Sequence, residues 1–276
     1  MTEQIKIALL VSRQTTSAKS VIQKYQQGVF EKIKPVLIIS SNPQSEILPI
    51  AEKSGIKTEV IQRSNCKSDI DFGHKLLKTL KQERVDLIAQ LGWSSKTPFG
   101  VIAEYKNYIF NQFSAPLDPG RQDFGGVGMY GNRAVLAVLL YNCFSGESIP
   151  TEATTHLVTK YYNDGEIISR KELKFTNPFG IFTREQIMSR KKYQEYVMAK
   201  AHQFKEELGP IECDNVISTL KSYQDGQPKI YKREKPLVPQ DKLVYLSKAK
   251  KLAIDLGNKI KQYNTTQPIP DSFILE

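Results

Sequence analysis

The sequence is poor in several features that would point to particular classes of protein. Its three cysteines lie far apart and show neither the pairing of a disulfide scaffold nor the spacing of a metal site. We therefore expect free thiols and no bound metal. No apolar run approaches the roughly 20 residues that cross a membrane, and the first residues lack the basic and then apolar layout of a secretory signal. We expect a cytoplasmic protein with no membrane partner.

The chain of 276 residues has a net charge of +10, which could attract nucleic acid, membranes or phosphorylated small molecules. Its lysines are spread among glutamates along segments of helical spacing, as at Lys191, Lys192 and Glu195. This mixture is typical of a solvated helix face. Because the sequence also has no recognised DNA- or RNA-binding module, we do not expect nucleic acid as a partner.

Short apolar runs alternate with segments of helical spacing in the first part of the chain. The apolar runs predict strands at residues 5–11, 35–39, 58–61, 85–91 and 108–110. The helical spacing covers residues 18–33, 47–54 and 69–83. Strands that are apolar on both faces and alternate with helices predict an α/β fold, a mostly parallel twisted sheet with helices on both faces.

Further along the chain the pattern changes to a hairpin and then to helices. Residues 154–160 and 167–173 predict two strands joined by a turn at residues 161–165. Helices are expected at about residues 132–141, 184–208, 215–223 and from a cap at Asp241 to about residue 262. We therefore expect an α/β domain over residues 1–175 and a helical C-terminal extension, packed on it, over residues 176–276.

The last predicted helix carries apolar residues at a spacing that suits packing on the main domain. The same face could form a contact between two copies of the chain. A monomer and a homodimer therefore both stay open.

Ligands of an open parallel sheet bind beyond the carboxyl ends of its strands. The polar loop after the first strand opens a helix, whose free N–H groups could hold a phosphate together with the hydroxyls of Thr15, Thr16 and Ser17. Arg13 could add positive charge there. A simple helix cap by Thr15 or Thr16 explains the same pattern equally well.

A series of short motifs occurs in order along the chain. They are Ser41-Asn42, Gly55-Ile56, Gly92-Trp93, residues 111–114 (Asn-Gln-Phe-Ser), 125–131 (Gly-Gly-Val-Gly-Met-Tyr-Gly), 154–158 (Thr-Thr-His-Leu-Val) and 162–168 (Tyr-Asn-Asp-Gly-Glu-Ile-Ile). This order resembles the phosphoribosylglycinamide formyltransferase family of folate-dependent enzymes. The resemblance spans roughly residues 5–235 and implies a Rossmann-like formyltransferase fold.

The resemblance implies transfer of a formyl group from the co-substrate formyltetrahydrofolate to the amine of glycinamide ribonucleotide or a similar phosphorylated amine. Such a reaction belongs to purine biosynthesis and one-carbon metabolism. In the family an asparagine and a histidine stabilise the oxyanion, and an aspartate orients the histidine and helps to move protons. Asn111 matches the asparagine, whereas Phe113 stands at the histidine position and Asn163 at the aspartate position.

Two nearby residues are candidates to replace the missing groups. Asp164 could serve if the turn shifts by one residue, or it could be a turn residue that forms hydrogen bonds before Gly165. His156 could partner Asn163 or Asp164, although a histidine within a strand is more often a buried structural residue.

The resemblance also suggests where a folate would bind. Gly92, Trp93 and Ser94, together with Asn163, are the candidates for contact with formyltetrahydrofolate. Trp93 could pack against the folate ring, but a tryptophan after a strand is as often part of the core.

Three functions therefore stay open for the chain. The first, which we expect, is an enzyme of the formyltransferase family with a rearranged proton relay. The second is a catalytically impaired pseudoenzyme or ligand-binding protein that keeps the fold. The third is another nucleotide-binding Rossmann-like enzyme, with its nucleotide beside Ser41 and Asn42.

Overall fold

The computed structural model describes residues 4–12, 15–174 and 184–259 of the chain. The chain divides into two compact units. The first consists of Met1–Phe113, Thr154–Lys171 and Gly209–Lys232, and the second of Ser114–Ala153, Glu172–Leu208 and Arg233–Glu276. The domain boundary at residue 175 stays a prediction, because residues 175–183 lie outside the described part.

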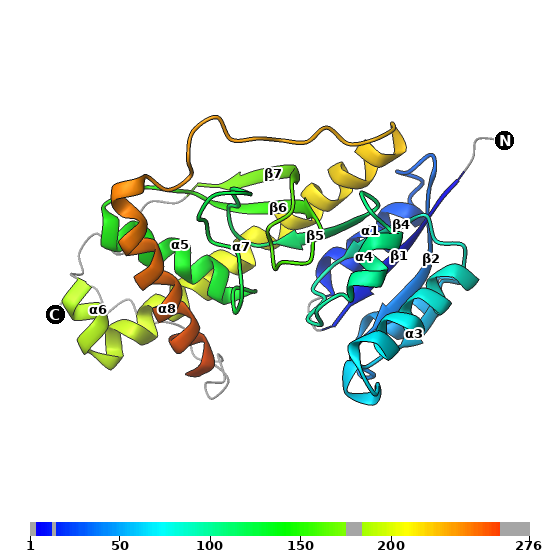
Figure 1. The fold of residues 1–276 in the computed structure, drawn as a ribbon, viewed down its shortest axis with the longest axis horizontal. Coiled ribbons are helices and arrows are strands. Elements are labelled where there is room, and N and C mark those ends of the chain that lie inside the picture. Colours follow the sequence, from blue (N-terminus) through cyan, green and yellow to red (C-terminus); the bar gives the residue numbers. More distant parts are fainter. Residues whose placement is uncertain (1–3, 13–14, 175–183, 260–276) are drawn as a thin grey trace. The chain divides into compact units, whose positions relative to one another are not determined.

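Seven strands form one sheet in the order β3-β2-β1-β4-β5-β6-β7 (Figure 1). The strands are β1 (Ile5–Val11), β2 (Ile33–Ser40), β3 (Lys57–Val60), β4 (Leu87–Gln90), β5 (Ile109–Phe113), β6 (Thr151–Leu157) and β7 (Ile167–Leu173). Strands β1 to β5 run parallel, and β6 runs antiparallel to β5. The predicted α/β fold with a mostly parallel sheet is confirmed.

The central strands are apolar on both faces because both faces of the sheet carry helices. Ile7 and Leu9 of β1 belong to one core cluster and Ala8 and Leu10 to another, as the alternation of side chains along a strand requires. The first cluster includes residues of α1 (Thr16–Gln26), α2 (Ile47–Lys53) and the last turns of α7 (Lys191–Gln224). The second includes residues of α3 (Asp69–Gln82) and α4 (Phe99–Glu104).

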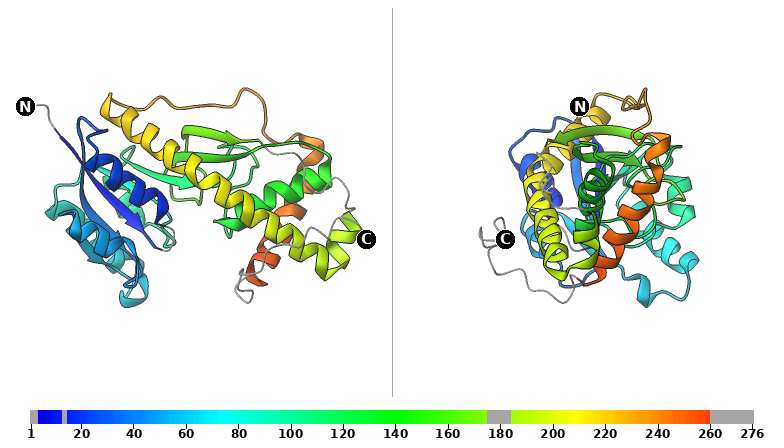
Figure 2. Two further views of the ribbon diagram at one scale, coloured as in Figure 1. Left: turned by 180° about the vertical axis from the view of Figure 1, so that it is seen from behind. Right: turned by 90° about the vertical axis from the view of Figure 1, so that its left-hand side faces the viewer.

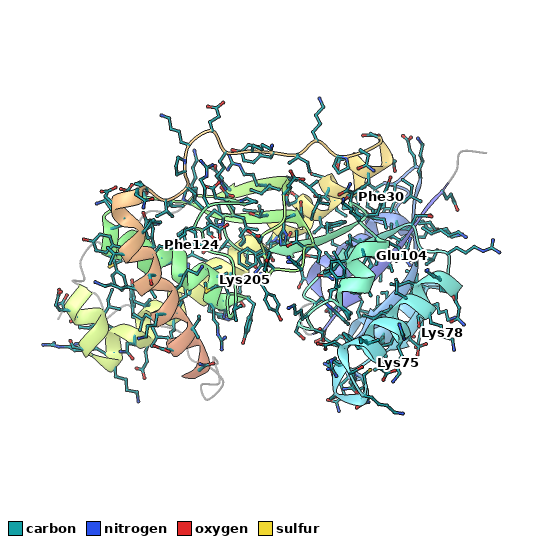
Figure 3. All side chains as sticks on the ribbon, in the orientation of Figure 1. Phe30, Lys75, Lys78, Glu104, Phe124 and Lys205 are labelled. Atoms are coloured by element: carbon teal, nitrogen blue, oxygen red, sulfur yellow. The ribbon has the colours of Figure 1, made fainter. Side chains whose placement is uncertain are left out.

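The second unit is built around α5 (Asn132–Ser145), which is buried on nearly every side. Helix α8 (Leu243–Lys259) packs on α5. Its apolar face is buried there, namely Leu246, Ala249, Leu252, Ala253 and Leu256. Phe124, labelled in Figure 3, packs edge-on against Tyr141 of α5, with ring centroids 5.6 Å apart. The apolar spacing of the last helix therefore serves packing within the chain.

Several predicted helix bounds are wrong. The helix expected over residues 18–33 ends at Gln26, and the apolar spacing continues past it because Phe30 and Ile33 are buried in the connection and in β2. Asp241 lies in a short 3-10 turn (Gln240–Lys242), so α8 begins only at Leu243. The end expected near residue 262 lies outside the described residues. Helix α4 was not predicted, because its six residues are too few to show helical periodicity.

The two helices expected over residues 184–208 and 215–223 are instead α6 (Arg184–Ser189) and the single helix α7, which is continuous through Pro210 (Figure 2). Proline inside a helix removes one hydrogen bond and costs about 3 kcal/mol. Buried residues on both sides of it, Leu208 and Val216, stabilise the helix by packing. This burial outweighs the local preference of the proline.

Two helical glycines, one in each unit, allow the α5–α8 contact of the second unit to be tested. A Cβ at Gly257 of α8 would lie 2.5 Å from Cγ of Arg133, whereas a Cβ at Gly209 of α7 would meet nothing within 4 Å. We expect Gly257→Ala to lower the free energy of unfolding by about 1–3 kcal/mol, because it overpacks the α5–α8 contact. Gly209→Ala should raise it by up to about 1 kcal/mol, because alanine favours the helix. Urea denaturation measures both, and equal effects of the two changes would contradict the close contact at Gly257.

Candidate functional site

The centre of the candidate site is a pair of residues facing each other across β5 and β6. Asn111 of β5 is registered directly opposite His156 of β6 in the antiparallel ladder. Directly opposite residues carry their side chains on the same face of a sheet. Nδ2 of Asn111 accordingly lies 3.1 Å from Nε2 of His156.

The turn between β6 and β7 brings a third residue to this pair. Nδ2 of Asn111 also donates a hydrogen bond to Oδ1 of Asn163, over 3.3 Å. Asn163 has a φ of 51°, in the left-handed region that asparagine tolerates better than most residues. A Cβ at Gly165 would lie 1.7 Å from the carbonyl oxygen of Leu157, so glycine is required for the turn to pack this closely. We call Asn111, His156 and Asn163 the amide network.

The protonation of His156 follows from its partners. Nδ1 lies 2.8 Å from the carbonyl oxygen of Leu157, which can only accept, so Nδ1 carries the proton. Nε2 therefore accepts a hydrogen bond from Asn111. Complete burial lowers the pKa of His156 from its usual 6.5 to about 4, although the bonds to Leu157 and Asn163 and the charge of Asp164 act in the opposite direction. The imidazole is neutral at pH 7.

The amide network limits the chemistry of the site. Both hydrogens of the Asn111 amide have acceptors within the network, His156 and Asn163. A ligand oxygen can take one of them only by displacing that acceptor. Phe113, two residues along β5 on the same face, is 4% exposed and has no hydrogen-bond donor to add. The network is complete as it stands, so the Asn111 amide becomes available to a ligand only after a rearrangement.

Asp164 lies beside the network in the turn between β6 and β7. Its side chain is exposed, and its charge reaches His156 through space. This placement fits the alternative of a turn residue, and its assignment as a catalytic group stays a prediction.

Three of the four residues predicted to contact a folate lie in the loop after β4, and the fourth, Asn163, belongs to the amide network. Trp93 stacks on Phe72 of α3, with ring centroids 6.3 Å apart and planes at 9°. The indole is thus partly core, as one alternative predicted. Its Nε1 is buried and has no hydrogen-bond partner. The same loop approaches the β6–β7 turn, where the Lys96 ammonium lies 5.8 Å from the ring centroid of Tyr162. Gly92 and Ser94 flank Trp93 in this loop.

The residues predicted to hold a phosphate lie at the start of α1. Thr15 occupies the N-cap position, but its side chain makes no capping hydrogen bond. The simple capping role for Thr15 is therefore wrong. Thr16 is exposed and Ser17 is half-buried, while Arg13 lies outside the described residues. The Thr15 side chain therefore accepts no hydrogen bond from the N–H groups in the first turn of α1.

Sequence reasoning missed a contact among three serines of the first unit. The hydroxyl of Ser12, after β1, lies 2.6 Å from that of Ser41, after β2, and accepts hydrogen bonds from both the backbone N–H and the hydroxyl of Ser94. Each serine follows a strand at the carboxyl edge of the sheet, which is the signal that could have indicated their proximity.

A cavity of about 530 Å³ lies at the opposite edge of the sheet. It is lined by residues at the amino ends of β1, β2 and β4 and at the end of α7, including Ile5, Lys32, Asp86 and Gln224. No predicted site residue lines it, and the hydrogen-bonded groups of the amide network are a stronger indication of function than this open depression.

Residues 5–117 match the family model described as formyl transferase. This segment includes Asn111 and Phe113 and ends before His156 and Asn163. No curated protein matches the chain.

Among the described residues, no helix has the length and apolar character of a membrane span, and no cluster of side chains suitable for a metal occurs.

Several solved structures share the fold of this chain. Glycinamide ribonucleotide transformylase 1 from Symbiobacterium toebii is 16% identical over 82% of this chain and 90% of its own, with a TM-score of 0.59. Phosphoribosylglycinamide formyltransferase from Anaplasma phagocytophilum is 17% identical over 85% and 98%, also with a TM-score of 0.59. Formyltetrahydrofolate deformylase from Burkholderia mallei is 15% identical over 80% and 66%, with a TM-score of 0.56. At these identities the likeness shows the fold, and the predicted formyltransferase fold is confirmed.

The lowered pKa of His156 makes stability depend on pH in a defined window. Between about pH 6.5 and pH 4 the unfolded chain binds a proton that the folded chain excludes, so stability is lost as the pH falls through this range. The whole pKa shift changes the free energy of unfolding by about 3 kcal/mol. We expect the gap in unfolding free energy between the native protein and His156→Gln to shrink by about this amount from pH 7 to pH 4. Urea denaturation across the range measures it, and a constant gap would show that the imidazole is not held neutral.

Proposed function

We propose that the chain is a formyltransferase-family protein that transfers a formyl group from formyltetrahydrofolate to the amine of glycinamide ribonucleotide or a similar phosphorylated amine, and does so slowly. Such an activity would serve purine biosynthesis. The observation that carries the proposal is the position of Asn111. It lies in β5 where the ladder with β4 ends, inside the segment that matches the formyl transferase family, with its amide beside the β6–β7 turn.

The residues present fit a folate in two respects. The buried, unpartnered Nε1 of Trp93 is a donor that a ligand acceptor could satisfy, and the amide of Asn111 is a second donor at the same edge of the sheet. When bound, formyltetrahydrofolate would supply the formyl carbon that the amine attacks. The first turn of α1, which no Thr15 side-chain bond caps, suits the phosphate of the acceptor.

The role of Asn111 in the reaction would be to donate from Nδ2 to the formyl oxygen as negative charge builds there. To do so it must release His156 or Asn163. Phe113 adds no second donor, and the absence of one such donor costs about a hundred- to a thousandfold in rate. Asn163 cannot accept the proton that the amine loses, so that proton would pass through water to the folate nitrogen that leaves as tetrahydrofolate. Slow turnover follows from these residues.

A second candidate function is ligand binding without turnover. The observation that favours it is the closed amide network, in which both Asn111 hydrogens and both nitrogens of His156 already have partners. A network satisfied in this way holds its geometry well but must be broken to stabilise a developing charge.

Restoring the family's residues tests the proposed function. Phe113 is buried on the same face as Asn111, and Asn163 has a φ that aspartate also tolerates, so Phe113→His with Asn163→Asp should fold. We expect feeble formyl transfer to glycinamide ribonucleotide by the native protein and a gain of about a hundredfold or more in the double variant. A formyl-transfer assay with formyltetrahydrofolate measures both.

The control is the same double variant with Asn111→Ala, which should lose the gain because the remaining oxyanion donor is removed. Calorimetry with folinic acid, a stable formyl folate, separates the two candidates. Binding without turnover in either protein would favour the binding function. Absence of both binding and turnover would contradict the proposed function.

A further inference from the structure

One oxygen, the hydroxyl of Ser12, joins three loops of the first unit. It lies 2.6 Å from the hydroxyl of Ser41, 2.9 Å from the backbone nitrogen of Ser94 and 3.0 Å from the hydroxyl of Ser94. The three residues follow β1, β2 and β4, and Ser94 is 82 positions from Ser12 in the chain. We call these residues the serine hub.

The directions of these hydrogen bonds follow from the capacity of a hydroxyl. Ser12 accepts from the N–H and from the hydroxyl of Ser94, and these two bonds fill its two acceptor positions. Its own proton must therefore go to Ser41. The hydroxyl of Ser12 makes every hydrogen bond that it can make. Because Ser12 is only 2% exposed, water has little access to replace any of them.

The hub fixes the loop that carries Trp93. Two of its three bonds go to Ser94, the residue after Trp93, and a bond between Gln90 and Thr97 ties the ends of the same loop together. The indole then rests on Phe72, with its buried Nε1 without a partner. Stacking alone would let the indole of Trp93 slide over the ring of Phe72. The hydrogen bond from the Ser94 N–H to Ser12 fixes the backbone next to Trp93 and so sets the position of the indole.

We propose that Ser12 is a positioning residue, which holds the loop of Trp93 in the place where its indole N–H meets a ligand acceptor. The ligand is the folate of the proposed function, and the proposal rests on that function for this identity. Loss of the Ser12 hydroxyl would leave the Ser94 N–H and the Ser41 hydroxyl without their partner. The part of the loop around Ser94 would then lose its hydrogen bonds to Ser12, while the base of the loop keeps the backbone bond from Leu91 to Leu10 of β1.

Trp93 is the only tryptophan of the chain, so indole fluorescence reports on this loop directly. Without ligand, we expect Ser12→Ala to make the emission of Trp93 more accessible to acrylamide, with at least about a twofold rise in the quenching constant, because the freed loop admits water to the indole. With folinic acid as the probe, we expect about a tenfold loss of affinity, the typical effect of removing one buried hydrogen-bonding group.

Ser40 offers a matched control. It is as buried as Ser12, but its hydroxyl bonds only within its own turn, to the backbone of Asn42. Ser40→Ala should leave both the quenching and the folinic acid affinity of the native protein unchanged, even if it lowers stability. Ser94→Ala keeps the backbone bond to Ser12 and loses one hydroxyl bond, so its effects should fall between those of the native protein and Ser12→Ala. This variant also serves if Ser12→Ala does not fold.

The outcomes separate this inference from the proposed function. If the native protein binds no folinic acid, the proposed function fails, while the quenching without ligand still decides whether Ser12 positions Trp93. If the acrylamide quenching constants of Ser12→Ala and Ser94→Ala both equal that of the native protein, the inference is overturned. Equal effects of Ser12→Ala and Ser40→Ala would also overturn it, because they would show a general loss of packing. Raised quenching with unchanged affinity would overturn the role in ligand binding.

Discussion

The candidate site depends on the antiparallel pairing of β5 with β6. In this register Asn111 stands opposite His156, and a slip by one residue would turn His156 to the other face of the sheet. The turn that follows reinforces the register, because only glycine at position 165 lets the chain pass so close to the Leu157 carbonyl. That carbonyl accepts a hydrogen bond from Nδ1–H of His156, so the other ring nitrogen, Nε2, carries no proton and is an acceptor. Backbone geometry thus sets the protonation of the site.

The same geometry limits how well the site can serve catalysis. A buried amide network with all its partners present is rigid, and the complete burial of His156 lowers its pKa to about 4. A rapid formyl transfer needs a donor that is free when charge develops and a group that accepts a proton near pH 7. Asn111, His156 and Asn163 satisfy each other instead. This is a physical reason to expect that binding has been kept more fully than turnover.

Much of the first unit could be predicted from the sequence, because strands apolar on both faces leave a clear pattern, as at residues 5–11. The turn expected within the hairpin is also found between β6 and β7, and Oδ1 of its Asn163 lies 3.3 Å from Nδ2 of Asn111. Other features depend on tertiary contacts that no local pattern records. Helix α7 continues through Pro210 because packing outweighs the local preference, and Ser12 meets Ser94 only after the sheet has formed.

The segment that matches the family and the residues that complete the site are not the same part of the chain. Residues 5–117 contain the five parallel strands, the start of α1, the Trp93 loop and Asn111. The acceptors that surround Asn111 come from β6 and the turn after it. The strands that form the parallel part of the sheet and the two acceptors of the Asn111 amide therefore come from separate stretches of the sequence. Fold and chemistry can diverge here because different residues determine them.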